Sequence, residues 1–304
     1  MKFLKKRAAI LSIMLLGFLL FNSAPAANAY SKHGPTYVFI DGKEPLFTND
    51  PFIKYGTTLI EFRPVFEMLG LQVGWDSKTK TVTGKKANLT IKMRINDRVA
   101  YVNNKKVILS QAPLILNGRT MVPLRFVAEA SGKKVYWDGT TRMIIINDGN
   151  FTKADFTFNE SDISPQLVED AKTGKLGPFH ASQHGKPLAQ IVNKYGFPDA
   201  RHDGTPYSDD IPFVIYGDYL MYYLGTKGPD YTKQPTVRSI HAILPEAVTN
   251  QDMIDIFGRD YKFDYGMYTN MIYDLGTYTV YIETEGDRSY NHPYYLSVGE
   301  PEWN

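Results

Sequence analysis

A gapless internal repeat constrains the first half of this chain more than any other feature. Shifting the sequence by 62 positions aligns residues 38–83 with residues 100–145, and 13 of the 46 aligned residues are identical. The identical pairs include Gly56/Gly118, Arg63/Arg125, Gly70/Gly132, Trp75/Trp137 and Asp76/Asp138. A duplicated segment builds the same structural unit twice, so we expect two copies of one fold at residues 36–84 and 98–146.

Each copy predicts a strand, a tight turn, one short helix and two further strands. The turns are indicated by Asp41-Gly42 and by Asn103-Asn104, because these residues tolerate a positive φ. Apolar residues at i, i+3, i+4 and i+7 predict the first helix, namely Phe62, Val65, Phe66 and Leu69. Gly70 and Gly132 are predicted to end the two helices in the left-handed conformation. The sequence therefore predicts small α+β units with one short helix on antiparallel strands.

Two repeated positions carry further expectations. Trp75 and Trp137 occupy the same position in the two copies, so we expect both to be largely buried at equivalent core sites if the repeat is structural. Arg63 and Arg125 recur on the two helices, each four residues before a glutamate. We interpret them as partners of buried ion pairs with Glu67 and Glu129 rather than as ligand clamps.

Three segments of the second copy resemble a known domain. Residues 103–106, 113–125 and 135–141 closely resemble the N-terminal "stalk" domain of copper amine oxidases, which is abundant in secreted proteins of Gram-positive bacteria. The resemblance covers about residues 36–147, and the first copy departs from it with Glu61-Phe62-Arg63-Pro64 where the pattern has Pro-Leu-Arg. It predicts a stalk-type domain of two repeats at residues 30–147.

The resemblance does not imply amine oxidase activity. The oxidase family makes its quinone cofactor from a tyrosine in an Asn-Tyr-Asp/Glu motif and binds copper through His-x-His and a distant histidine. This chain has neither motif, and its six histidines are scattered, at positions 33, 180, 184, 202, 241 and 292. We therefore expect no cofactor and no oxidase activity.

The start of the chain predicts secretion. Residues 1–29 combine basic residues, a 14-residue apolar run at 8–21 and the small-residue motif Ala27-Asn28-Ala29. This pattern is typical of a signal peptide, with cleavage between Ala29 and Tyr30 and no membrane anchor afterwards. The chain has no cysteine, which excludes disulfides, thiolate metal sites and a cysteine nucleophile.

Charge divides the chain into two differently built halves. Residues 30–150 hold 18 Lys and Arg against 10 Asp and Glu, a net charge of +8. Residues 151–304 hold 12 against 22, a net charge of −10. A basic secreted domain can hold the anionic polymers or peptidoglycan of a Gram-positive wall by salt-sensitive attraction. The alternative is that the lysines only solvate a sheet surface.

The second half predicts another α+β domain. Residues 148–163 indicate a linker with one strand at 156–158, and Ser164-Pro165 predicts the start of a helix that ends near Gly174. Residues 188–199 and 252–260 each predict a helix closed by a glycine, and each precedes a predicted hairpin, at 213–224 and 270–283. We therefore expect residues 164–304 to form two helix-plus-antiparallel-sheet units. This plan resembles an uncharacterised domain of secreted Bacillus-type proteins, and also the tandem repeats of secreted β-lactamase inhibitor proteins.

Tyrosines are the candidate ligand-binding residues of this second domain. Sixteen of the 21 tyrosines follow residue 150, and alternation on strand 219–224 places rings on both of its faces. Exposed tyrosines can stack on sugars or dock a protein, whereas buried ones would simply suit the sheet. The predicted surface consists of Tyr216, Tyr219, Tyr222, Tyr223, Tyr273, Tyr278 and Tyr281.

Metal and catalytic signals in this half are weak. His180 and His184 have the i, i+4 spacing of zinc ligands, but no glutamate follows the first histidine. Carboxylates crowd the segment from Asp199 to Asp210, where calcium binding is the alternative to solvated turn residues. We assign no catalytic, metal-binding or cofactor-binding residue.

These observations together predict a secreted, non-catalytic binding protein of the cell envelope. Its expected partners are anionic wall polymer or peptidoglycan and a secreted protein, with no nucleic acid and no membrane. The alternatives are a hydrolase of wall glycan or peptide and an inhibitor of a secreted enzyme.

Overall fold

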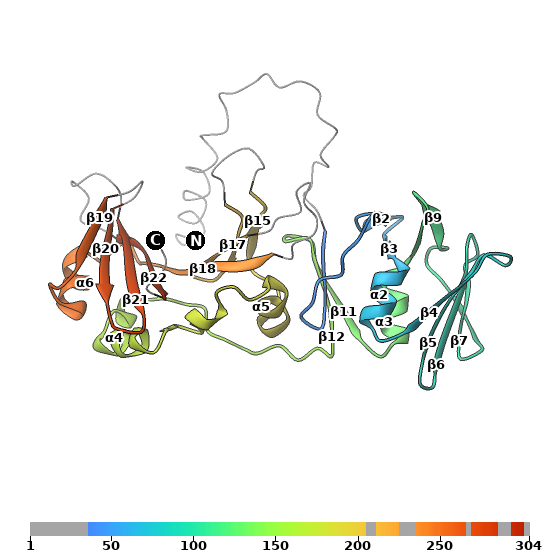
Figure 1. The fold of residues 1–304 in the computed structure, drawn as a ribbon, viewed down its shortest axis with the longest axis horizontal. Helices are drawn as coiled ribbons and strands as arrows, with labels where there is room; N and C mark the ends of the chain where they lie inside the picture. The colour runs from blue at the N-terminus through green and yellow to red at the C-terminus, as the bar shows by residue number, and fades with distance from the viewer. Residues whose placement is uncertain (1–35, 205–210, 225–234, 266–268, 285–292, 301–304) are drawn as a thin grey trace, which may run out of the picture. The chain divides into compact units, whose positions relative to one another are not determined.

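The computed structural model describes residues 36–204, 211–224, 235–265, 269–284 and 293–300. They form the expected α+β fold, in which short helices pack on mostly antiparallel sheets (Figure 1). Each helix within the described ranges is too short or too polar to cross a lipid bilayer.

The two copies of the repeat fold into equivalent elements. The first copy contains β2 (Phe52–Lys54), β3 (Thr57–Glu61), α2 (Phe62–Met68), β4 (Gln72–Asp76) and β5 (Thr81–Lys86). The second contains β9 (Leu114–Leu116), β10 (Arg119–Pro123), α3 (Leu124–Ala130), β11 (Lys134–Asp138) and β12 (Met143–Asn147). The shift of 62 residues therefore relates the elements as well as the sequence.

The predicted turns and helix ends of the repeat are confirmed. Asn103 and Asn104 have φ values of 48° and 67°, as the turn requires. Gly70 and Gly132 lie just beyond α2 and α3 with φ values of 73° and 83°. This left-handed conformation carries little strain only for glycine, which explains why both copies have glycine there.

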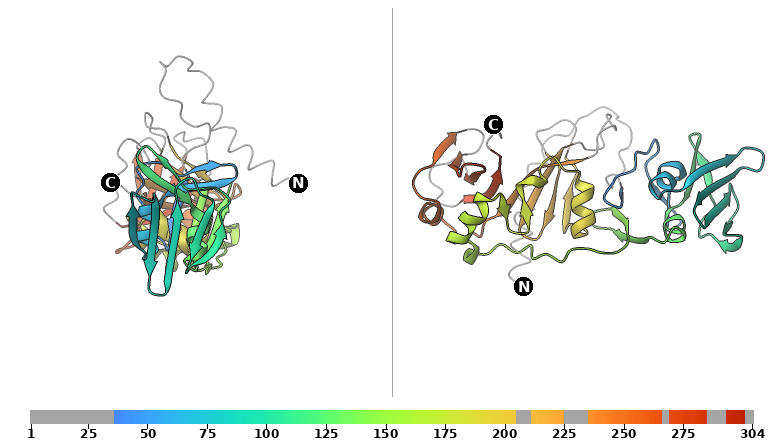
Figure 2. Two further views of the ribbon diagram at one scale, coloured as in Figure 1. Left: turned by 90° about the vertical axis from the view of Figure 1, so that its right-hand side faces the viewer. Right: turned by 60° about the horizontal axis from the view of Figure 1, so that its bottom comes forward.

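The two copies interlock through a shared sheet. Strands β3 and β10 pair with each other at the centre of the sheet β2-β3-β10-β9. Helix α3 packs on β3 of the other copy, and α2 packs reciprocally on β10. The first copy continues into a five-stranded sheet with β6 (Leu89–Arg94), β7 (Val99–Val102) and β8 (Lys105–Ile108), whose blue-green strands face the viewer in Figure 2, left. The fold of each copy thus depends on strands from the other.

The three-stranded sheet β1-β12-β11, in which β1 spans Tyr37–Ile40, contributes side chains to two hydrophobic cores, one on each of its faces. Strand β1 pairs in parallel with β12, and both strands are buried along their whole length. Alternate residues such as Val38 and Ile144 enter the core of the stalk-type domain. The intervening residues, including Tyr37 and Phe39, enter the core formed by the second half of the chain. This parallel pairing departs from the antiparallel arrangement expected for the first half.

The second half forms one large antiparallel sheet with helices beside it. Its helical segments are η1 (Glu160–Asp162), α4 (Pro165–Lys172), η2 (Ala181–Gln183), α5 (Leu188–Tyr195) and α6 (Asn250–Phe257). A small hairpin, β13 (Lys175–Leu176) and β14 (Phe179–His180), precedes η2. The strands of the large sheet are β15 (Ala200–His202), β16 (Phe213–Tyr216), β17 (Tyr219–Leu224), β18 (Thr236–Ile243), β19 (Lys262–Tyr265), β20 (Thr269–Asp274), β21 (Thr279–Thr284) and β22 (Pro293–Gly299).

The two predicted helix-plus-sheet units are fused edge to edge. The strand order is β15-β16-β17-β18-β22-β21-β20-β19, so the fourth strand of one unit pairs with the fourth strand of the other. The predicted ends of α5 and α6 are confirmed, because Gly196 and Gly258 cap them with φ values of 88° and 90°.

The strand predicted at residues 156–158 is wrong. This segment joins no sheet, because carboxylates take its backbone N–H groups: Thr157 donates to Asp155, and Phe158 donates to Asp218 at 3.0 Å. The alternating rings instead fill the core, where Phe156 lies 5.1 Å from the Tyr216 ring. The alternating apolar residues therefore belong to an extended segment that packs on the core, and its backbone hydrogen-bonds to carboxylates instead of to another strand.

Candidate binding site

Trp75 and Trp137 lie at the surface, so the prediction that they are buried is wrong. Their exposed fractions are 42% and 39%. Trp137 faces Ile144 across the β11–β12 ladder, in a row of residues that belongs to the stalk-type core. However, β4 and β11 are edge strands of their sheets, so no strand in the described part of the chain covers the outer side of either indole. The repeat therefore predicted that the two tryptophans occupy equivalent positions, but not that the core ends before it covers them.

Trp137 lines a pocket of about 340 Å³. The first copy contributes the β2–β3 hairpin, including Ile53, Thr57 and Thr58. The second copy contributes the start of α3, including Arg125, and the apolar strand residues next to Trp137. The pocket therefore exists only because the two copies interlock.

The polar groups of this pocket are hydroxyls and one guanidinium. The Thr57 hydroxyl donates a hydrogen bond to the Ser110 hydroxyl at 2.9 Å, which fixes two of the hydroxyls on the rim. Arg125 is exposed, and its first-copy counterpart Arg63 contacts Glu67 at 3.7 Å with both side chains more than half exposed. The ion pair expected for Arg63 therefore exists, but it is a surface pair and not a buried one.

This lining is suited to binding and not to acid–base chemistry. Among the described residues that line the pocket, none carries a carboxylate, an imidazole or a thiol. An indole face stacks on sugar rings, and a guanidinium donates two parallel hydrogen bonds to phosphate or carboxylate. The pocket thus combines a stacking platform with an anion contact and hydroxyls.

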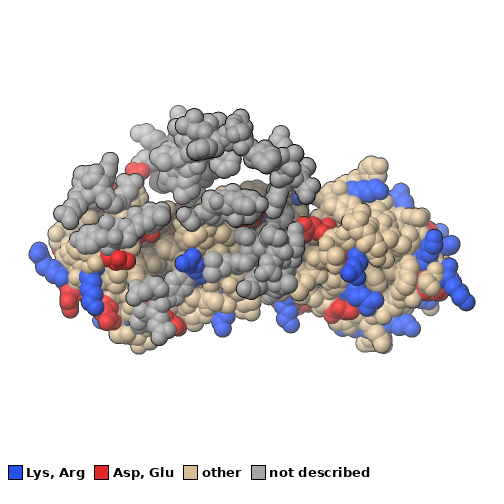
Figure 3. All heavy atoms as spheres, turned by 45° about the horizontal axis from the view of Figure 1, so that its top comes forward, with Lys and Arg blue, Asp and Glu red and all other residues tan. Residues whose placement is uncertain are grey.

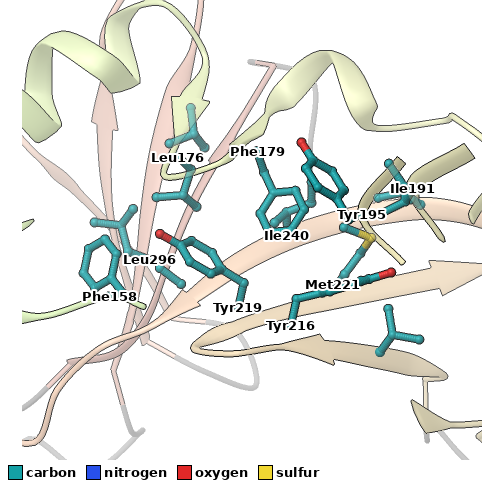
Figure 4. Packing of buried hydrophobic residues seen from close by; sticks show 14 of the residues in the cluster. Phe158, Leu176, Phe179, Ile191, Tyr195, Tyr216, Tyr219, Met221, Ile240 and Leu296 are labelled. Carbon is teal, nitrogen blue, oxygen red and sulfur yellow. The ribbon is translucent and has the colours of Figure 1, made fainter. Parts of the chain in front are cut away.

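Most of the tyrosines predicted to form a surface are instead in the core. Tyr216, Tyr219, Tyr223 and Tyr273 are at most 2% exposed. Figure 4 shows the Tyr216 and Tyr219 rings lying among the apolar side chains of the interior. These four rings have no face available to an external ligand.

Two of the buried tyrosines have matching structural roles. Tyr216 donates a hydrogen bond to the Gly196 carbonyl at 2.8 Å, and Tyr273 donates to the Gly258 carbonyl at 3.2 Å. Each bond ties a central strand to the end of the helix in the same unit. Burial raises the pKa of the Tyr273 hydroxyl to about 12 and that of Tyr216 further above its usual range. Both hydroxyls therefore stay protonated donors.

The other predicted tyrosines are half-buried and do not form one surface. Tyr222 and Tyr281 lie on the sheet face opposite the core residues of their strands, whereas Tyr278 lies in the turn between β20 and β21, near His180. Tyr222 belongs to a chain of ring contacts across five strands, which runs from His202 on β15 to Tyr295 on β22. The seven predicted tyrosines therefore divide into four in the core, two on the opposite face of the same sheet, and Tyr278 in a turn.

The structure does not bring the candidate metal-binding residues together into a site in the part of the chain that it describes. His180 Nδ1 accepts a hydrogen bond from the Ser182 N–H at 3.0 Å, so it caps the η2 turn. Asp199 accepts the Gly217 N–H, and Asp203 pairs with Arg201 at 2.9 Å. Asp209 and Asp210 lie outside the described residues. Over the ranges that are described, no group of three or more acidic, histidine or cysteine side chains is placed to hold a metal ion.

Sequence reasoning missed the pocket although it singled out two of its residues. Trp137 and Arg125 are both repeated at a spacing of 62, and both were interpreted as structural. The overlooked signal was the aspartate after each tryptophan. Asp76 and Asp138 accept hydrogen bonds from the turns that follow, at Thr79 and Thr141, which marks the end of each edge strand.

Comparisons with known proteins cover parts of the chain. A protease inhibitor from Brevibacillus choshinensis is 29% identical over 136 residues, which is 44% of this chain and 36% of that protein. The chain thus spans about a third of the length of this relative. The crystal structure of a DUF4309 family protein, YjgB from Bacillus subtilis, matches with a TM-score of 0.31 and 14% identity over 46% of this chain and 99% of that one.

The family comparison covers residues of both copies of the repeat. Residues 39–146 match the family model described as the copper amine oxidase N-terminal domain.

Proposed function

We propose that this protein is a secreted, non-catalytic binding protein of the Gram-positive cell envelope, and that its stalk-type domain binds anionic wall polymer. The observation that carries the proposal is the pocket where Trp137 and Arg125 lie together at the surface. The net charge of +8 on residues 30–150 supports an anionic ligand. Figure 3 shows many blue Lys and Arg side chains over the right-hand part of the molecule, where the stalk-type domain lies.

The chemistry of the pocket favours a polymer that contains both sugar and phosphate. Trp137 provides a flat apolar face for a sugar ring, while Arg125 provides the planar donor pair that phosphate prefers. Thr57 and Ser110 add hydroxyls that can exchange hydrogen bonds with the ligand. The volume of about 340 Å³ lies at the lower end of the range of small-molecule sites, which suits one or two repeating units.

Sedimentation with purified cell walls tests this function. Trp137→Ala and Arg125→Ala should each weaken retention of the full chain by about tenfold, because each removes a central contact. Raising salt several-fold should release the wild-type protein, since exposed charges are screened over about 8 Å at physiological ionic strength. Walls stripped of anionic polymer should not retain it.

Tyr101→Ala provides the matched control. Tyr101 is a comparably exposed aromatic residue, at 43%, and lies on the outer face of the five-stranded sheet. All variants should remain folded at the assay temperature, as thermal melting will show, so that a loss of binding is not a loss of folding. Equal retention on stripped and intact walls, or equal losses for Tyr101→Ala and Trp137→Ala, would contradict the proposal.

Inhibition of a secreted protease is the second candidate function. It is favoured by one observation, namely that the relative from Brevibacillus choshinensis is named a protease inhibitor. The full chain should then inhibit an extracellular bacterial protease at near-equimolar concentration and remain intact in the complex. Steady cleavage of the chain without inhibition of the proteases secreted by such bacteria would exclude this function.

A further inference from the structure

We propose that the stalk-type domain carries a second ligand site at Trp75, built like the Trp137 pocket, and that one anionic polymer occupies both sites. This inference rests on the proposed function and extends it from a single contact to a bivalent one.

Each copy of the repeat contributes elements to both ends of the stalk-type domain. The Trp137 pocket combines the β2–β3 hairpin of the first copy with α3 and β11 of the second. The equivalent elements, 62 residues away in the sequence, are the β9–β10 hairpin of the second copy together with α2 and β4 of the first copy. Helix α2 packs on β10 as α3 packs on β3, so the second combination is also assembled. In Figure 1, β2 lies on the side towards β11–β12 and β9 on the side towards β4–β7.

Equivalent apolar residues of the two sets are exposed to the same extent. Ile53 on the first hairpin is 51% exposed, and its counterpart Ile115 is 50% exposed. Trp137 and Trp75 are 39% and 42% exposed. In both pairs, a large apolar side chain is about half exposed in each copy of the repeat. A role in the core would have buried these side chains, so we infer that a binding function was duplicated together with the fold.

The two sets carry the same net charge of +1, but the charged groups at their surface differ. The counterpart of Thr57 is Arg119, which is exposed. Arg63 replaces Arg125, and its contact with Glu67 at 3.7 Å is an exposed pair of the kind that contributes little energy. The counterpart of Pro123 is Glu61, a buried carboxylate that accepts hydrogen bonds from the backbone and side-chain N–H groups of Asn49. The Trp75 set therefore has two exposed guanidinium groups and one buried carboxylate that is already hydrogen-bonded. An acidic polymer with repeating phosphates matches both sets.

Two sites on one domain favour a polymer over a small ligand. Once one site holds the polymer, the second binding step occurs within the same complex, at a high effective concentration. We therefore expect long chains to bind roughly a hundredfold or more tightly than short fragments of the same polymer. Neither site alone can produce this gain.

Calorimetry on the full chain tests the inference, with a soluble glycosylated polyol-phosphate polymer as probe, in short fragments and in long chains. Wild-type protein should bind two short fragments per chain. Trp75→Ala and Trp137→Ala should each bind one, and the double variant should bind none. Each single variant should also lose most of the additional affinity for long polymer, while Tyr101→Ala should keep it.

The outcomes separate this inference from the proposed function. One fragment per wild-type chain, lost in Trp137→Ala and unaffected by Trp75→Ala, would overturn the second site and leave the proposed function intact. No binding of fragments or polymer by the folded wild type would overturn both.

Discussion

At the scale of single residues, burial and edge position decide which aromatic side chains are available for binding. Tyr216 and Trp137 both follow apolar alternation along a strand, yet Tyr216 is 2% exposed and Trp137 is 39% exposed. The difference arises because β16 lies between two strands, whereas β11 pairs on one side only. Local sequence fixes which face of a strand a side chain occupies, but not how many neighbouring elements cover that face. For this reason the sequence predicted exposed tyrosines and buried tryptophans, whereas most of these tyrosines are buried and both tryptophans are exposed.

The matched hydrogen bonds of Tyr216 and Tyr273 provide a prediction at this scale. Tyr216→Phe should lower the free energy of unfolding by about 1–3 kcal/mol, because the buried Gly196 carbonyl loses its donor. Tyr273→Phe should cost less, since its bond to Gly258 is longer and less buried. Denaturant unfolding of both variants checks the order. A larger cost for Tyr273→Phe would show that these bonds do not explain the repeated tyrosines.

At the scale of elements, the sequence identified most helices and hairpins but not their assembly. Helix caps at Gly196 and Gly258 and the turn at Asn103-Asn104 depend on local backbone rules, and the structure has them where expected. The fusion of two units through β18 and β22 depends on pairing between residues about 55 positions apart, such as His241 and Ser297. No local pattern specifies such a pairing, so it could not be predicted.

Strand β18 also changes partners along its length, and two histidines lie at that change. Its start bonds to the segment after His184, where the Gly185 N–H donates to the Val237 carbonyl, and its end pairs with β22. Burial, together with nearby histidines, lowers the pKa of His184 and of His241 to about 4. Both imidazoles are therefore neutral in the folded protein at neutral pH.

This arrangement predicts acid sensitivity. An unfolded histidine has a pKa near 6.5, so between about pH 6.5 and 4 the unfolded chain binds more protons than the folded one, and stability falls as pH drops through that window. Each histidine should contribute about 3 kcal/mol by pH 4, so the combined loss should be on the order of 6 kcal/mol. His241→Asn should flatten the dependence of unfolding free energy on pH in this window, while the shared carboxylate titrations remain. Parallel pH profiles for wild type and variant would contradict this assignment.

At the scale of the whole molecule, the sheet β1-β12-β11 makes the two halves interdependent. Val38 and Ile144 belong to the core of the stalk-type domain, while Tyr37 and Phe39 belong to the core of the second half. Arg201 lies over the Tyr37 ring at 4.7 Å, and Asn147 donates to Asn193 at 3.1 Å. The contrast in charge and composition predicted two differently built halves, but composition does not reveal that one strand pair serves both cores.

We therefore expect the full chain to unfold in one cooperative transition, and the isolated halves to be unstable. A fragment of residues 30–150 would expose the apolar face that contains Tyr37 and Phe39, and a fragment of residues 151–304 would lose those side chains from its core. Replacing Phe39 with Ala, a change at a fully buried ring, should cost about 3–5 kcal/mol and lower the melting temperature of both halves together. Calorimetry combined with hydrogen exchange measures whether protection is lost in both halves at the same temperature. Two separate transitions, with only the second half affected by Phe39→Ala, would show that the shared sheet does not couple the two cores.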